Sequence, residues 1–316
     1  MNDEEDAEKR LIGALPTSMV ATVIRELKEA ARMSKERPEE GLKIVKGIIS
    51  EAKWVGDNNI LYSAQSQYIR EVIRLERYEE AVAMATECLA SLKKYCSDSS
   101  DTFWIAKRDD TLEMLAYTCG MTGRFDESKR AFDELIASAT RVFGRDHDKT
   151  QNIFFSLRQV LREMATKAHD LVSRGDLANA AGYADAVLSE SKARDFLDAN
   201  DPNVQMNCET MVVAACVLSD VGREKESLAV SRLCLESARE RKDLDSGMSQ
   251  KCMWNYVRIS HDLYGPTKDL KVVLDDLRAI SPYKPEAPRT QSGLAHGNNP
   301  RLLCGYNTTA SFFVPR

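Results

Sequence analysis

Apolar and small residues recur along this chain with the period of an α-helix. After Ser128 they stand three or four residues apart and mark one helix face: Ala131, Phe132, Leu135, Ile136, Ala139, Val142 and Phe143. A second stripe follows Ala81, at Met84, Ala85, Cys88, Leu89 and Leu92. The sequence has no long alternating runs of β-branched residues, which half-buried strands would need. The pattern therefore predicts an all-α fold.

Six short segments share one plan, in which a turn and an acidic or polar pair precede a small residue that opens a helix. The segments are "RPEEGLKIV" (37–45), "ERYEEAVAM" (76–84), "GRFDESKRA" (123–131), "RGDLANAAG" (174–182), "GREKESLAV" (222–230) and the weaker "PTKDLKVVL" (266–274). We call the position of the small residue the slot; it holds Gly41, Ala81, Ser128, Ala180, Ser227 and, in the weaker copy, Leu270. Successive slots lie 40, 47, 52, 47 and 43 residues apart. Self-similarity at such a period is typical of stacked helical repeats.

A further apolar helix precedes each turn, so that every repeat is a helix pair. These first helices are predicted near 17–35, 58–75, 102–121, 149–173, 203–220 and 247–262. Four of their starts carry residues suited to a cap or a first helical position: Asp57 with Asn58, Ser100 with Asp101, Asp146 or Asp148, and Asp201 followed by Pro202. Gly123 is expected to end the helix before it, and Gly144 the helix that follows Ser128.

A single pair cannot bury its own apolar face, so neighbouring pairs must stack. We therefore expect the repeats to form one domain over residues 16–281. A charged, flexible N-terminus (1–15) is expected before it, and a disordered tail rich in Pro, Gly and Asn (282–316) after it.

One repeat carries a motif that resembles a known family. The turn "GRFDES" is followed, after a helix, by "FGRDHDKT" and then by two spaced leucines. This order is similar to the kinesin-light-chain type of tetratricopeptide repeat (TPR), with matches at Gly123, Arg124, Phe125, Glu127, Ser128, Phe143, Gly144, Asp146, His147, Thr150, Leu157 and Leu161. Ser156 and Arg158 depart from the Asn and Ala of the family. The resemblance extends over about residues 37–281 and implies a right-handed α-solenoid of about five to six antiparallel helix pairs.

The resemblance also implies a function. In such stacks the first helices line the concave side, which offers a long surface to a peptide or a partner helix. We therefore expect a non-enzymatic protein–protein interaction scaffold or adaptor. Counting back from the slots gives the candidate partner-binding residues: Ser66, Arg70, Glu113, Tyr117, Arg162, His169, Glu209, Val212 and Cys216. The first four stand where the Lys/Asn/Arg clamp of Hsp70/Hsp90-binding members would begin, so binding of these chaperone tails is not expected.

Charge and cysteine content argue against several other functions. The net charge is −5 and the pI about 5.6, whereas phosphate binding needs a concentrated basic surface, so no nucleic-acid partner is expected. The small cluster of Arg158, Arg162 and Lys167 is interpreted as a solvated helix face. Eight cysteines include no C-x-x-C pair, and neither a disulfide framework nor a metal or cofactor is predicted. No catalytic motif is present, and His147 is interpreted as a residue that shapes the connection and caps a helix.

The same sequence gives a prediction for the location of the protein. No stretch of 18 apolar residues occurs, so neither a membrane span nor a membrane partner is predicted. The charged start "MNDEEDAEKR" lacks the basic and apolar regions of a secretory signal, which favours a cytoplasmic protein and leaves a nuclear one open. A regulatory sensor that binds a small ligand or a signal peptide is the alternative function; an RNA-binding repeat and an enzyme are less favoured. The partner, the pathway and the oligomeric state stay open.

Overall fold

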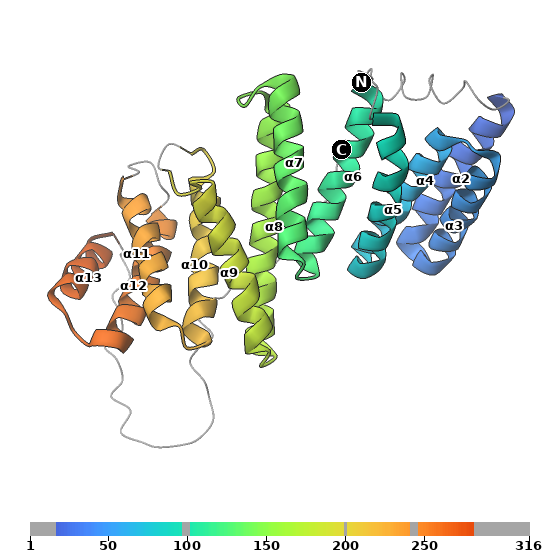
Figure 1. The fold of residues 1–316 in the computed structure, drawn as a ribbon. Helices are drawn as coiled ribbons and strands as arrows, with labels where there is room; N and C mark the ends of the chain where they lie inside the picture. The colour runs from blue at the N-terminus through green and yellow to red at the C-terminus, as the bar shows by residue number, and fades with distance from the viewer. Residues whose placement is uncertain (1–16, 97–101, 199–200, 241–245, 281–316) are drawn as a thin grey trace.

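The computed structural model describes residues 17–96, 102–198, 201–240 and 246–280, and within these ranges the chain is all-α (Figure 1). The helices are α2 (Thr17–Glu36), α3 (Pro38–Val55), α4 (Asn58–Arg74), α5 (Tyr78–Cys96), α6 (Thr102–Met121), α7 (Phe125–Phe143), α8 (Asp148–Ser173), α9 (Leu177–Ala193), α10 (Val204–Asp220), α11 (Glu224–Glu240), α12 (Ser246–Tyr264) and α13 (Lys268–Ile280). The all-α prediction is confirmed. Both ends of each predicted first helix lie within two residues of the observed ends. The predicted N-terminus (1–15) and tail (282–316) lie outside the described residues.

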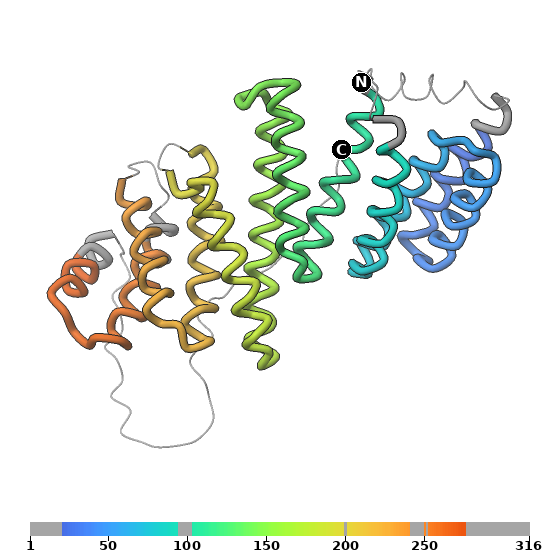
Figure 2. The backbone as a smooth tube through the Cα atoms, viewed as in Figure 1, coloured from blue at the N-terminus to red at the C-terminus, as the bar shows by residue number. Residues whose placement is uncertain are grey.

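The helices pack as consecutive pairs: α2/α3, α4/α5, α6/α7, α8/α9, α10/α11 and α12/α13. Figure 2 shows these pairs following one another in a single row, from the blue end to the orange end. First helices contact one another in succession from α2 to α12, whereas successive second helices of the described chain make at most isolated contacts. Successive repeats approach most closely on the inner side of a curved stack. We therefore use the name concave face for the surface that the first helices (α2, α4, α6, α8, α10 and α12) turn away from their paired second helices.

The slot residues lie where the two helices of a pair cross, and all of them are buried. The Ser128 hydroxyl donates a hydrogen bond of 2.7 Å to the backbone carbonyl of Ala116. Ser227 donates the same bond to the carbonyl twelve residues before it. At Gly41 an added Cβ would stand 2.8 Å from the carbonyl oxygen of Ala30, too close for any other residue without a backbone shift. The small residues of the repeat are thus explained by close approach of two helix backbones.

In five of the six described pairs, a left-handed residue turns the chain between the two helices, five positions before the slot. In four pairs it is Gly123, Gly175, Gly222 or Gly265, with φ between 68° and 84°, which confirms the predicted turn at the first of these. In α4/α5 the same position is Glu76, with φ 57°. A residue with a Cβ costs about 1–2 kcal/mol in this conformation. The exposed Glu76 is therefore a strained version of the shared turn.

The start of α8 is capped by His147. Its Nδ1 accepts a hydrogen bond of 3.2 Å from the backbone N–H of Lys149, and its ring stacks on Phe143 with centroids 5.1 Å apart. The interpretation of His147 as a helix cap is therefore confirmed. The predicted cap, Asp146 or Asp148, is wrong, because the imidazole fills that role and Asp148 is already the first helical residue. Phe143 also departs from its predicted core stripe: it is 41% exposed and packs on this connection.

The starts of α4 and α10 give one confirmation and one correction. Asp57 accepts hydrogen bonds of 3.0 Å from the backbone N–H groups of the second and third residues after it, as predicted. Pro202, however, is not the first helical residue, because α10 begins at Val204. Asp201 instead accepts a hydrogen bond of 2.7 Å from the backbone N–H of Asn203. The predicted cap of α6 lies outside the described residues.

An almost buried ion pair ties α8 to the connection before α10. Nη2 of Arg158 lies 2.5 Å from Oδ2 of Asp201, and the two side chains are 7% and 12% exposed. The guanidinium also lies over the ring of Phe196, 4.4 Å from its centroid. Arg158 Nε and Nη1 have no hydrogen-bond partner in the described part of the chain. Arg158, which departs from the family motif, thus holds two repeats together, and the carboxylate of Asp201 compensates its charge.

Replacing Glu76 by glycine should raise the free energy of unfolding by about 1 kcal/mol, because glycine adopts the left-handed turn without the Cβ clash. Gly175→Ala should lower it by about the same amount. No atom lies within 4 Å of that added Cβ, so only the backbone sets the cost. Urea unfolding followed by circular dichroism measures both. Glu76→Ala is the control, since it removes the carboxylate and keeps the strain; a Glu76→Gly variant no more stable than this control contradicts the account.

Asp201→Asn should lower the free energy of unfolding by about 3 kcal/mol, because it leaves the buried Arg158 cation without a counter-charge. The double variant Arg158→Met/Asp201→Asn should recover most of this loss, since the cation is gone and methionine keeps an apolar stem. Thermal and urea unfolding of both single variants and the double variant give the coupling. Strictly additive losses would show that the two charges do not depend on each other.

Candidate partner-binding face

The nine candidate residues all lie on first helices, as the sequence predicts. Five side chains reach the surface, two of them exposed and three half-buried: Arg70 and Arg162, and Glu113, His169 and Glu209. Four side chains are buried beneath that surface: Ser66, Tyr117, Val212 and Cys216. Counting from the slots therefore finds the correct helices, but it does not separate the residues on the concave face from those under it.

The buried candidates join neighbouring repeats. The hydroxyl of Tyr117 on α6 donates a hydrogen bond of 2.6 Å to Oε2 of Glu163 on α8. The pKa of Tyr117 is raised, first by burial and then by the hydrogen bond to Glu163. Cys216 on α10 donates from Sγ to Oδ1 of Asn255 on α12, at 3.2 Å. These contacts exist because successive first helices touch, so part of each inner helix face is covered by the next repeat.

Three charged residues stand together on the concave face: Arg70 on α4, and Asp110 and Glu113 one turn apart on α6. We call them the α4–α6 charge cluster. Burial raises the pKa of both carboxyl groups, and Arg70 opposes the shift at each. Asp110 is exposed and Glu113 is half-buried. None of the three forms an ion pair with another described residue.

Asp110 was not among the sequence candidates, although a signal for it exists. It stands eighteen residues before its slot residue, Ser128. Arg162 has the same offset from Ala180, and so does Glu209 from its own slot. Applying one set of offsets to every repeat would have included Asp110.

Lys167 on α8 is a second residue whose place the sequence did not reveal. Its Nζ donates to the backbone carbonyl that ends α6 and lies over the rings of Tyr78 and Tyr183, 5.8 and 5.2 Å from their centroids. Burial lowers the pKa of its amine. The interpretation of Arg158, Arg162 and Lys167 as one solvated face is therefore wrong: Arg158 is buried and Lys167 is half-buried, which leaves only Arg162 exposed.

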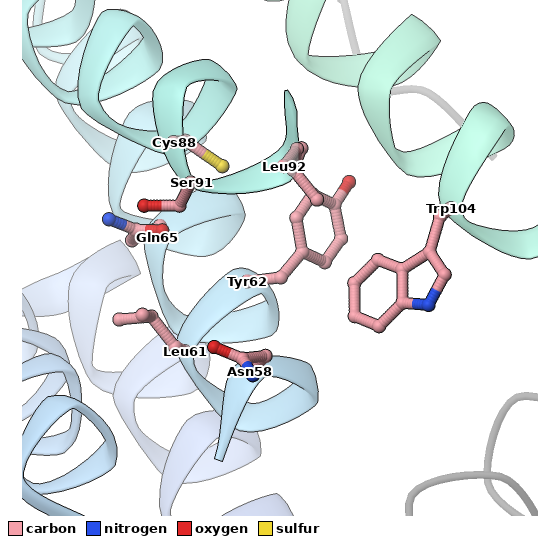
Figure 3. Close-up of a pocket in the computed structure, with 8 residues that line it drawn as sticks. All are labelled: Asn58, Leu61, Tyr62, Gln65, Cys88, Ser91, Leu92 and Trp104. Atoms are coloured by element: carbon pink, nitrogen blue, oxygen red, sulfur yellow. The ribbon is translucent and has the colours of Figure 1, made fainter. Parts of the chain in front are cut away.

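A small cavity lies between α4, α5 and α6. Eight residues line it (Figure 3): Asn58, Leu61, Tyr62, Gln65, Cys88, Ser91, Leu92 and Trp104. It has room for about one water molecule, whereas sites for small ligands usually enclose about 300 Å³ or more. Among the described residues, no group of three or more His, Cys, Asp or Glu side chains is placed to hold a metal ion. In the same ranges, no helix combines the length and apolarity that crossing a bilayer requires.

Comparison with known proteins gives one family match and several similar solved structures. Residues 110–148, from the last part of α6 to the start of α8, match the tetratricopeptide repeat family, which confirms the repeat type predicted from the sequence. One similar solved structure contains the nearly identical TPR-like repeats of a kinesin light chain from Podosopora anserina. It has 14% sequence identity and a TM-score of 0.34, and the match covers 69% of this chain and 93% of that chain. Another is BtubC (BKLC) from P. vanneervenii, with 13% identity, a TM-score of 0.34 and coverage of 88% and 97%. Comparison with curated proteins gives no match.

Tyr117→Phe should lower the free energy of unfolding by about 1.5 kcal/mol, because it removes a hydrogen bond to a carboxylate and keeps the ring. In a background of Glu163→Ala the same change should have little further effect. Chemical unfolding of the two single variants and the double variant gives the coupling energy. A coupling near zero would contradict the role of this contact in joining α6 to α8.

Proposed function

We propose that this chain, a TPR-like repeat protein, is a non-enzymatic scaffold or adaptor that binds a peptide segment or a helix of a protein partner on its concave face. The observation that carries the proposal is the α4–α6 charge cluster, three charged side chains on the inner side of the stack that form no ion pair with a described residue. Charged side chains on this surface can pair with complementary groups of a ligand.

The arrangement of the first helices favours an elongated partner. Successive first helices present their outer faces in a row, and repeat stacks of this kind bind peptides along extended surfaces. A segment that crosses α4, α6, α8 and α10 meets in turn Arg70, Glu113, Arg162 and Glu209. The described cavity between α4 and α6 has room for about one water molecule, so we place the partner on the surface.

The buried candidates serve the same function indirectly. Tyr117 and Cys216 hold first helices to their neighbours, while Ser66 and Val212 are buried under α4 and α10. Together they fix the spacing of the side chains above them. A binding surface built on rigid helices loses little conformational entropy when a partner is bound. We therefore assign direct contact to Arg70, Glu113, Arg162, His169 and Glu209.

Photo-crosslinking to a peptide tests this proposal without assuming the charge of the partner. Peptides are first selected from a random phage library on the full chain and then synthesised with a label. A photoreactive p-benzoylphenylalanine placed at Arg70 or Arg162 should crosslink to the labelled peptide, because both positions lie on the concave face. Mass spectrometry identifies the joined residues.

The matched control uses the opposite side of the stack. Lys43 on α3 and Lys192 on α9 are exposed on second helices, so the same photoreactive residue there should give little crosslinking. Crosslinking from these two positions instead of Arg70 and Arg162 would contradict the proposal. A library in which no peptide is enriched on the folded chain would do so too.

A further inference from the structure

Ion pairs join successive second helices, which otherwise make at most isolated contacts in the described chain. Counting the residues that directly flank each helix, they link α3 to α5, α5 to α7, α7 to α9 and α9 to α11. The pairs, with their nitrogen–oxygen distances, are Arg77–Glu39 (2.8 Å) and Lys53–Glu87 (2.5 Å), Arg124–Glu79 (2.8 Å), Lys129–Glu190 (2.7 Å) and Arg194–Asp133 (2.6 Å), and Arg223–Asp185 (2.8 Å). We call this set of ion pairs the outer ladder.

Three of the bridging arginines occupy the same place in the repeat. Arg77, Arg124 and Arg223 each stand four residues before a slot and directly before a second helix. In two of them an acid three residues later, Glu80 or Glu226, holds the guanidinium from its own helix. Another nitrogen of the same guanidinium then reaches back to the preceding second helix. A guanidinium has five N–H donors in a fixed fork, so one side chain can serve both acids.

The repeats that depart from this arrangement show what the arginine is used for. Arg37 also stands four residues before its slot, but the structure describes no second helix before α3. It pairs instead with Glu40 of its own helix, at 3.0 Å. Asp176 takes the place of the arginine before α9, and there Lys129 and Arg194 supply the bridges from other positions. Each described step from α3 to α11 therefore has a charged bridge, whether or not the turn provides the arginine.

Different forces hold the inner and the outer side of the stack. First helices meet through buried contacts, such as that of Tyr117 with Glu163, and through the apolar core, and salt screens buried contacts much less than exposed ones. Water reaches most of the ladder: Glu39 and Glu79 are 78% and 66% exposed. Exposed ion pairs contribute little stability each and weaken as the ionic strength rises. The spacing of the second helices is therefore easier to change than that of the first helices.

We propose that the outer ladder sets the curvature of the stack and that the stack becomes more curved when salt screens these ion pairs. In a curved stack the outer helices lie farther apart than the inner ones. Loosening the ladder lets the second helices separate while the first helices stay in contact, so the repeats bend further toward the concave face. The width of the concave face then depends on the ionic strength. This inference concerns the shape of the free chain and does not depend on the function proposed above.

Förster transfer along the inner side of the full chain tests the inference. A donor and an acceptor are attached through p-acetylphenylalanine at Ala21 of α2 and Gln205 of α10, which are exposed positions on first helices. Raising the ionic strength from about 0.01 M to about 1 M shortens the Debye length from about 30 Å to about 3 Å. Transfer should increase with salt, because the first helices keep their spacing and further bending brings the two labels closer.

A ladder-neutral variant shows whether the ion pairs cause this change. Glu79→Gln/Arg124→Gln/Asp185→Asn/Arg223→Gln removes the bridges from α5 to α7 and from α9 to α11 and leaves the net charge unchanged. At low salt it should already show higher transfer than the unmodified chain, and its response to salt should be smaller. Because exposed ion pairs contribute little stability, the variant should stay folded, which circular dichroism checks.

The matched control removes two exposed ion pairs that do not link second helices. Glu29→Gln/Arg32→Gln/Arg37→Gln/Glu40→Gln also leaves the net charge unchanged, and it should show the transfer and the salt response of the unmodified chain. Transfer that does not change with salt in the unmodified chain overturns the inference. So does a ladder-neutral variant that matches the control at both ionic strengths. Either result leaves the proposed function standing.

Discussion

The close approach of two helix backbones at each slot is the constraint on which the rest of the structure depends. At Ser128 and Ser227 one hydroxyl spans the gap to a carbonyl of the first helix, and at Gly41 the gap is too narrow for a Cβ. Helices that meet this closely cannot slide or rotate far without a clash. Each pair therefore has a fixed shape, and the larger apolar residues beside the slot pack against the next pair.

Stacking of such pairs determines where a partner can bind. First helices touch their successors, so part of every inner helix face is used for contacts such as Tyr117 with Glu163 and Cys216 with Asn255. The candidate side chains that project past these contacts are polar. The α4–α6 charge cluster is one place where such side chains are charged.

The helices, their pairing and the slot residues followed from the sequence because the interactions that set them are local. A turn five residues before a small residue, and a helix stripe after it, appear in the sequence at fixed spacing. The exposure of individual inner side chains did not follow, since Tyr117 and Cys216 are covered by residues 46 and 39 positions away. The helix caps show the same limit. The prediction of Asp57 as the cap of α4 was correct, but α8 is capped by the imidazole of His147, which stacks on Phe143, and not by Asp146 or Asp148.

The most direct test of the account is hydrogen–deuterium exchange of the full chain with and without a peptide selected on it. The account predicts that the peptide slows backbone exchange chiefly in α4, α6, α8 and α10. Second helices should change less, because they lie behind the surface that the peptide covers. Protection concentrated in α3, α5, α7 or α9 would place binding on the convex side and contradict the central claim that the inner faces of the stack form the binding surface.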